Sequence, residues 1–152
     1  MITIDKKLIS DLFVQAAANG RLRQNFDLRT SPEEGCQRML NALLPGTQVP
    51  VHRHPRSNES VVCIKGKLVE VLYEEEDCAK IFPMGMDAQD VPSGRRLKVS
   101  SRCLLDPSEG VYGCVVPSGA WHTVEVLEPS VILEMKDGCY GEDGSESIVM
   151  SV

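Results

Sequence analysis

The chain lacks the features that mark several large classes of protein. It has no apolar run of about 18 residues, the least that a membrane-spanning helix needs. Its 16 lysines and arginines are outnumbered by 22 aspartates and glutamates, which gives a net charge of −6. Nucleic acids and anionic membrane surfaces favour a basic face. We therefore expect no nucleic acid and no membrane among its partners.

Secretion signals and paired cysteines are also missing. The N-terminal segment MITIDKKLISDLF carries charges at positions 5, 6, 7 and 11, so it lacks the apolar core of a signal peptide. None of the six cysteines forms a C-x-x-C pair, which argues against a zinc knuckle or a redox pair. We expect a cytoplasmic protein whose thiols stay reduced.

The composition that is present fits one soluble domain. At 152 residues the chain has the length of a single domain, and 42% hydrophobic with 25% charged residues is ordinary for a globular protein. We expect one domain over residues 1–152, with an N-terminal helix in residues 1–20 and a β-barrel over residues 37–140.

The predicted helix begins after Asp5, which can cap it. Apolar residues follow at helical spacing from Leu8 to Ala16, and Asn19-Gly20 can end the helix because both tolerate positive φ. We expect this helix to cover a sheet face or the mouth of a barrel. The next segment, residues 21–32, is polar and is predicted to be a loop.

From residue 37 onward, short apolar runs are separated by proline and glycine, which predicts an all-β fold, an antiparallel sandwich or barrel. Lys65-Gly66 predicts a tight hairpin turn between two of the runs, and residues 145–152 supply one more strand or a tail. The expected strands are Gln37–Leu44, Gln48–His54, Glu59–Lys65, Lys67–Tyr73, Cys78–Phe82, Leu97–Leu105, Val111–Val116, Ala120–Leu127 and Val131–Lys136.

The segment GTQVPVHRHPRSNESVVCIKG, residues 46–66, holds two of the three histidines. Alternate residues of a strand point the same way, so His52 and His54 share a face. Glu59 begins the next strand, on the face of the apolar Val61 and Cys63. A carboxylate buried among apolar residues needs a partner, so we expect Glu59 to meet the two imidazoles.

The third histidine, His122, shares a strand face with Val124 and Val126 and also points inward. Three imidazoles and one carboxylate suit a divalent transition metal such as Fe, Mn, Co, Ni, Zn or Cu. The alternative is that each histidine is a surface residue or a core residue with its hydrogen bonds satisfied.

These residues resemble the two motifs of the cupin family, Gly46-x5-His52-x-His54-x4-Glu59-x6-Gly66 and Pro117-x-Gly119-x2-His122. The resemblance implies a cupin-type antiparallel β-barrel or jelly roll. It also implies that His52, His54, Glu59 and His122 bind one divalent transition metal (Fe, Mn, Ni, Co or Zn).

Over most of residues 1–140 the chain resembles the WbuC family of cupin-fold metalloproteins. The segments that carry the resemblance are RLRQNF, QRMLNALLPG and VVPSGAWHTVEVLEPSVILEMKDG, with a tyrosine just after the last. The family is associated with bacterial surface-polysaccharide gene clusters. The resemblance therefore implies a small polar metabolite, such as a sugar or nucleotide sugar, as the ligand.

Three functions remain open at the level of the sequence. The chain is a metal-dependent enzyme acting on a small polar molecule, an Fe(II)-dependent dioxygenase, or a non-enzymatic module that binds or senses a small ligand. Two covers also remain open for the apolar outer face of residues 60–64: the helix, or a second subunit in a homodimer. The candidate ligand-binding residues are Arg21, Arg23, Asn41, Gln48 and Tyr140.

Overall fold

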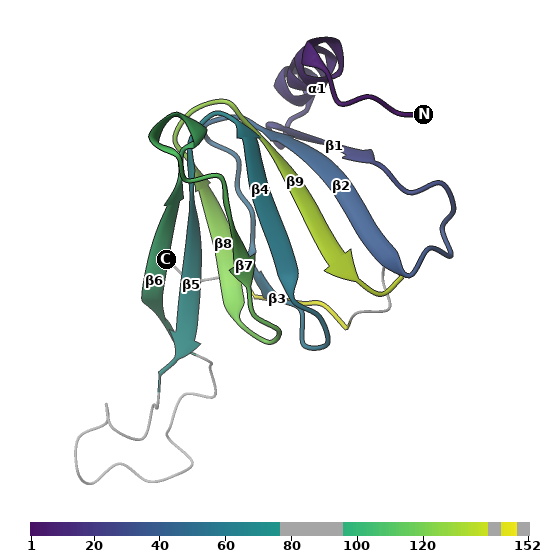
Figure 1. Ribbon diagram of the computed structural model, residues 1–152. Coiled ribbons are helices and arrows are strands. Elements are labelled where there is room, and N and C mark those ends of the chain that lie inside the picture. Colours follow the sequence, from purple (N-terminus) through teal and green to yellow (C-terminus); the bar gives the residue numbers. More distant parts are fainter. Residues whose placement is uncertain (77–95, 140–143, 149–152) are drawn as a thin grey trace, which may run out of the picture.

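A computed structural model describes residues 1–76, 96–139 and 144–148 (Figure 1). It contains helix α1 (Lys6–Ala18) and a short 3-10 turn at Pro107–Glu109. No helix in these ranges is both long and apolar enough to cross a bilayer. The strands are β1 (Arg23–Asp27), β2 (Cys36–Leu43), β3 (Val51–Arg53), β4 (Glu59–Lys65), β5 (Leu68–Glu75), β6 (Leu97–Leu105), β7 (Gly113–Val116), β8 (Trp121–Val126), β9 (Ser130–Asp137) and β10 (Glu146–Ile148).

The strands form two antiparallel five-stranded sheets, which confirms the all-β jelly-roll prediction. One sheet has the order β1-β2-β9-β4-β7 and the other β10-β3-β8-β5-β6. Strands close in sequence are often in different sheets: β3 and β4 are separated by a short loop and lie in opposite sheets. The chain therefore passes repeatedly between the layers, as Figure 1 shows.

Helix α1 begins as the sequence predicts, because the Asp5 side chain accepts a hydrogen bond of 2.9 Å from the Leu8 N–H. It then packs on the outer face of the first sheet, which confirms that it covers a sheet face (Figure 1). Ile64 packs in this cluster, so the helix rather than a second subunit covers this part of β4. The fully buried members are Leu12, Ala16, Leu40, Ala42 and Val131.

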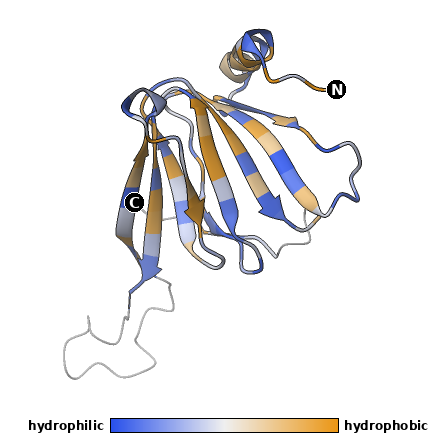
Figure 2. Ribbon diagram, viewed as in Figure 1, coloured by the Kyte–Doolittle hydropathy of each residue, from blue (hydrophilic) through white to orange (hydrophobic). Residues whose placement is uncertain are grey.

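A second apolar cluster lies between the two sheets. On β4 the inward residues Val61 and Cys63 are each 2% exposed, while the alternate residues are less buried. The strands in Figure 2 carry this mixture of hydrophobic and hydrophilic residues along their length. The buried members of this core are Leu43, Val61, Cys63, Leu68, Leu105 and Ile132.

Two local predictions were wrong. Residues 21–32 contain β1, because an edge strand that pairs only with β2 can keep the polar sequence of a loop. Helix α1 does end at the predicted place, with Asn19 as its C-cap. A positive φ follows at Leu22 (φ 55°), whose carbonyl oxygen accepts hydrogen bonds from the Leu44 N–H and the Thr47 hydroxyl.

The predicted hairpin at Lys65-Gly66 is also wrong, because β4 and β5 lie in different sheets and do not pair. Gly66 has φ 91°, and a Cβ there would lie 2.3 Å from the Pro129 carbonyl oxygen. The glycine thus allows a close crossing between layers rather than a hairpin. One more C-terminal strand is confirmed as β10, whereas the predicted strand Cys78–Phe82 lies outside the described residues.

Candidate metal centre

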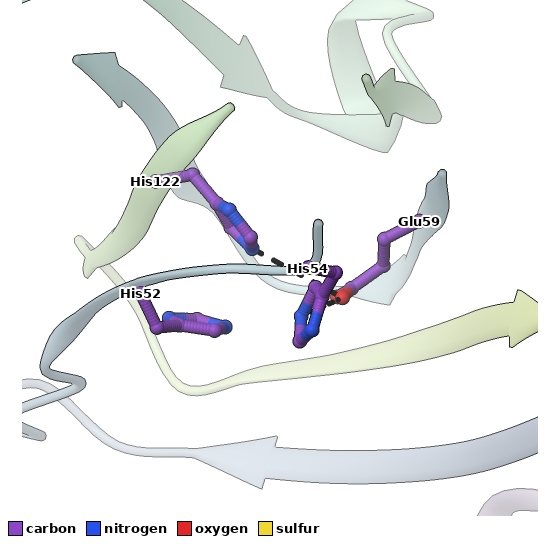
Figure 3. A group of neighbouring side chains, drawn as sticks. All are labelled: His52, His54, Glu59 and His122. Atoms are coloured by element: carbon purple, nitrogen blue, oxygen red, sulfur yellow. Dashed lines mark ion pairs between the residues drawn. The ribbon is translucent and has the colours of Figure 1, made fainter. Parts of the chain in front are cut away.

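Four side chains from both sheets meet at one end of the sandwich. His52 of β3 and His122 of β8 are directly opposite each other in the ladder of one sheet, and His54 follows β3 immediately. Glu59 begins β4 in the other sheet. One ligand atom from each of the four residues lies within 4.8 Å of the others. Figure 3 shows the three rings and the carboxylate converging.

Two neighbouring loops hold this arrangement in place. The turn before β8 approaches the turn after His54, and the Gly119 N–H donates a hydrogen bond of 2.9 Å to the His54 carbonyl. The Ser118 hydroxyl donates to the Pro55 carbonyl at 2.8 Å. The loop that delivers His122 is therefore fastened to the segment that delivers His54.

Main-chain carbonyls set the tautomers of two rings. His52 Nδ1 lies 3.0 Å from the Pro50 oxygen and His122 Nδ1 lies 3.1 Å from the Ala120 oxygen. A carbonyl can only accept, so each Nδ1 must carry the proton, and each Nε2 presents its lone pair. His122 Nε2 is buried and has no hydrogen-bond partner among the described residues, the nearest carboxylate oxygen, of Glu59, being 4.0 Å away. A bound metal would supply the partner that this nitrogen lacks.

His54 and Glu59 lie in contact, with 2.8 Å between His54 Nε2 and a Glu59 oxygen. The other nitrogen, His54 Nδ1, lies 2.8 Å from the Ser145 hydroxyl. The Lys136 ammonium lies 3.1 Å and 3.3 Å from the two ring nitrogens. Metal binding through Nε2 would therefore replace the lysine contact at that nitrogen, while the Ser145 contact can remain.

The electrostatics leave these donors in the forms that a metal requires. Burial and the neighbouring His122 lower the pKa of His52 to about 4, and burial lowers the pKa of His122. Burial acts to raise the pKa of Glu59, but the hydrogen bond from His54 and the nearby His122 and Lys136 outweigh it and lower that pKa. Near neutral pH these two imidazoles are therefore neutral and the carboxylate is charged.

Three of the four metal-ligand candidates, His52, Glu59 and His122, line a cavity of about 320 Å³. Arg21, which is exposed, and Arg23, which is partly buried, lie at its rim. Asn41 lines the same cavity and donates a hydrogen bond of 2.7 Å to Glu134. Of the predicted ligand-binding residues, the structure thus brings these three together with His52, Glu59 and His122.

Gln48 is not brought to this cavity. The predicted strand Gln48–His54 begins only at Val51, so the alternation that would align Gln48 with His52 does not extend to it. Pro50 lacks the N–H that a ladder needs. Gln48 lines a separate pocket with Tyr73 and Thr123. Tyr140 lies outside the described residues.

Two cavity residues were missed at the level of the sequence. Burial and the charge of Glu59 raise the pKa of Glu70 to about 9 and that of Glu134 to about 8. Glu70 is only 2% exposed. A signal for it was present, because the run LVEVL places Glu70 on the same strand face as the buried Leu68. An inward acid in an apolar strand marks a functional site in the same way as Glu59.

Comparison with solved structures assigns the fold. The chain matches the TT1209 protein from Thermus thermophilus with a TM-score of 0.53 and 20% identity, over 91% of this chain and 98% of that one. It matches the cupin domain of Schizosaccharomyces pombe Cnp3 with a TM-score of 0.50 and 12% identity, over 76% and 64% of the two chains. The protein is therefore a cupin-fold jelly roll with a buried His₃Glu group.

An oxalate oxidase in complex with the substrate analogue glycolate also matches, with a TM-score of 0.53 and 16% identity. The match covers 86% of this chain but only 57% of the oxidase. In sequence, residues 4–80 match the family described as a domain of unknown function, DUF6016. The chain belongs to that family. No curated protein matches it.

Proposed function

We propose that this protein is a metal-binding cupin that acts on a small polar metabolite. His52, His54, Glu59 and His122 would hold one divalent transition metal. The observation that carries this proposal is the convergence of four ligand atoms within 4.8 Å. The unpartnered Nε2 of His122 and the tautomers set by two carbonyls support it.

The cavity beside the four residues supports a polar and anionic ligand. A bound divalent metal acts as a Lewis acid that polarises a carbonyl or hydroxyl oxygen. Neither the Arg21 nor the Arg23 guanidinium makes an ion pair or hydrogen bond in the described part of the chain. Two unpaired guanidinium groups at one rim suit a carboxylate or phosphate, which each can bind with two parallel hydrogen bonds.

A proton-transfer group is available in the same cavity. All three histidines are occupied as candidate ligands, so a carboxylate must serve as the base. Glu134, with a pKa raised to about 8 and an oxygen fixed by Asn41, can exchange a proton near neutral pH. This supports an enzyme over a module that only binds or senses its ligand.

The biological setting rests on the sequence alone. The resemblance to the WbuC family supports a cytoplasmic role in surface-polysaccharide metabolism, with a sugar or nucleotide sugar as the ligand. An Fe(II)-dependent dioxygenase is the second candidate, because three imidazoles and a carboxylate suit iron as well as a Lewis-acid metal.

We also propose a homodimer. Several large apolar side chains on β6, β7 and the segment between them are between 40% and 63% exposed, and monomers seldom expose such groups together. These residues are Val99, Leu104, Val111, Tyr112 and Val115. Sedimentation of the wild-type chain and of a Tyr112→Ser, Val115→Ser double variant tests it. A wild-type protein that sediments as a monomer contradicts the proposal.

Metal analysis of protein purified without added metal tests the main proposal. We expect close to one transition-metal ion per chain in the wild type and a loss of most of it in His122→Ala and in Glu59→Gln. Glu125→Gln on β8 is the matched control, since Glu125 pairs with Arg102 on the surface and should keep the metal. Full metal retention in both ligand variants would overturn the proposed ligand set.

The identity of the metal separates the two candidate reactions. Iron, with oxygen consumption when a substrate is added, supports the dioxygenase. Zinc supports Lewis-acid chemistry and argues against oxygen activation, because zinc has no redox chemistry.

A further inference from the structure

The carboxyl group of Glu70 has no hydrogen-bond partner among the described residues. Its side chain is 2% exposed, and both of its oxygens are buried without a hydrogen bond to any group in the described residues. Buried polar atoms are nearly always hydrogen-bonded, because leaving one unpaired is costly. Glu70 lines the cavity that also contains His52 and His122, rather than the apolar core. A molecule inside the cavity can therefore reach it.

The charges around the cavity restrict what that molecule is. Arg21 and Arg23 line the cavity and make no ion pair with any described residue, and Arg21 disfavours the charge on Arg23 while Glu134 favours it. The two guanidinium groups favour an anionic group at their end of the cavity. The unpartnered oxygens of Glu70 suit a hydroxyl group, because a hydroxyl can both donate to and accept from a carboxyl group.

A single ligand has to interact both with the two arginines and with Glu70. Neither arginine contacts Glu70, although all three residues line one cavity. At about 320 Å³ the cavity is at the lower limit for ligand pockets, which suits a metabolite rather than a larger molecule. Its polar lining, which includes Asn25 and Asn41, offers further hydrogen bonds to hydroxyl groups.

We propose that this cavity binds a small polyhydroxylated anion, with its carboxylate or phosphate held by Arg21 and Arg23 and one of its hydroxyl groups hydrogen-bonded to Glu70. The inference rests on the proposed function, because it names the ligand class of the same site. It gives Glu70, which is not one of the proposed metal ligands, a role in binding the ligand.

Calorimetric binding to the full chain tests this inference, on protein as purified and again after metal removal. The probes are matched in pairs. Gluconate is compared with hexanoate and glycerol 3-phosphate with propyl phosphate, so that each pair differs only in hydroxyl groups. Sorbitol is the neutral polyol. We expect each hydroxylated anion to bind about three- to tenfold more tightly than its partner, and sorbitol to bind more weakly than either hydroxylated anion.

Variants test the contribution of Glu70 and that of the arginines one at a time. Glu70→Leu should reduce the ratio within each pair to about one, while Glu70→Gln, whose amide also donates and accepts, should keep most of it. Arg23→Gln should weaken both members of a pair equally and leave the ratio unchanged. Glu125→Gln, on the surface of β8, is the control and should change nothing.

Two results would overturn the inference: an unchanged ratio in Glu70→Leu, or no binding of any probe at about 10 mM. Comparison of the two pairs decides between a carboxylate and a phosphate. Metal content, measured on the same samples, should be equal in Glu70→Leu and wild type. A chain without metal but with the hydroxyl preference would contradict the proposed function alone.

Discussion

The space between the two sheets has two halves that differ in chemistry but share the same strands. In one half, residues such as Val61, Leu68 and Leu105 form an apolar core. In the other half, the inward positions are taken by Glu59, Glu70 and the histidines. On β4 a single step of two residues, from Glu59 to Val61, passes from one half to the other.

This contrast shows how a small fold can accommodate a site that lowers its stability. Within the described residues the polar half contains an acid and an imidazole nitrogen that make no hydrogen bond, and each lowers stability in the absence of a ligand. The apolar half, together with the helix cluster outside the sheet, contributes the burial that offsets this loss. Truncating a core side chain should therefore lower stability, whereas removing the unpartnered acid of the polar half should raise it.

The strongest effect is expected in the apolar half. Leu105→Ala removes a side chain that is 0% exposed and should lower the free energy of unfolding by about 2–5 kcal/mol, measured by urea denaturation. Leu127→Ala is the matched control, because the Leu127 side chain is 50% exposed and its truncation should cost less than about 0.5 kcal/mol. Equal losses at the two positions would contradict the assignment of the core.

Metal should stabilise the polar half. With free metal about 100-fold above the dissociation constant, the free energy of unfolding should rise by about 2.7 kcal/mol, seen as a higher Tm. Glu59→Gln should abolish this rise and Glu125→Gln should keep it. A rise of equal size in Glu59→Gln would place the binding site outside the polar half.

Removing the acid of Glu70 should stabilise the metal-free protein at alkaline pH. Its pKa of about 9 lies above the 4.5 of a free glutamate, so the folded state keeps a proton that the unfolded state releases. The free energy of unfolding should therefore fall as pH rises from about 4.5 to about 9. Glu70→Gln should lose part of this slope, since Glu134, whose pKa is also raised, contributes the rest, and it should be more stable by about 1–3 kcal/mol at pH 8.

Denaturation of wild type, Glu70→Gln and Glu125→Gln at pH 5 and pH 8 measures this effect. Glu125→Gln should follow the wild type, because its carboxylate is on the surface. A free energy of unfolding that is the same at the two pH values in all three proteins would refute a buried, protonated Glu70.

The smallest effect on stability is expected at Asn41, a residue of the polar half that already has a hydrogen-bond partner. Asn41→Ala removes the hydrogen bond to Glu134 and should cost about 0.5–1.5 kcal/mol. It should also raise the pKa of Glu134 further, since that hydrogen bond lowers it. Carboxyl-carbon NMR of Glu134 follows the titration. Asn25→Ala is the control. The Asn25 amide lines the same cavity but hydrogen-bonds to the Met39 sulfur, so its removal should leave the pKa of Glu134 unchanged.

The sequence predicted much of this protein because strand alternation is a local property. The fold class, the Asp5 cap and the inward direction of Glu59 and His122 all follow from neighbours two to four residues apart. Sequence reasoning missed β1, whose polar residues form a strand only because β2 pairs with them. It also misjudged Lys65-Gly66, since the same two residues can turn within a sheet or cross between sheets.

By itself the sequence determined which side chains face the interior, because that depends only on the period of an extended chain. Only the tertiary structure decided which of them meet. The pairing of β3 with β8 places His52 opposite His122, and the stacking of the two sheets brings Glu59 to both. The rim of Arg21 and Arg23 and the floor at Glu70 likewise come from strands distant in sequence, whose packing no local pattern specifies.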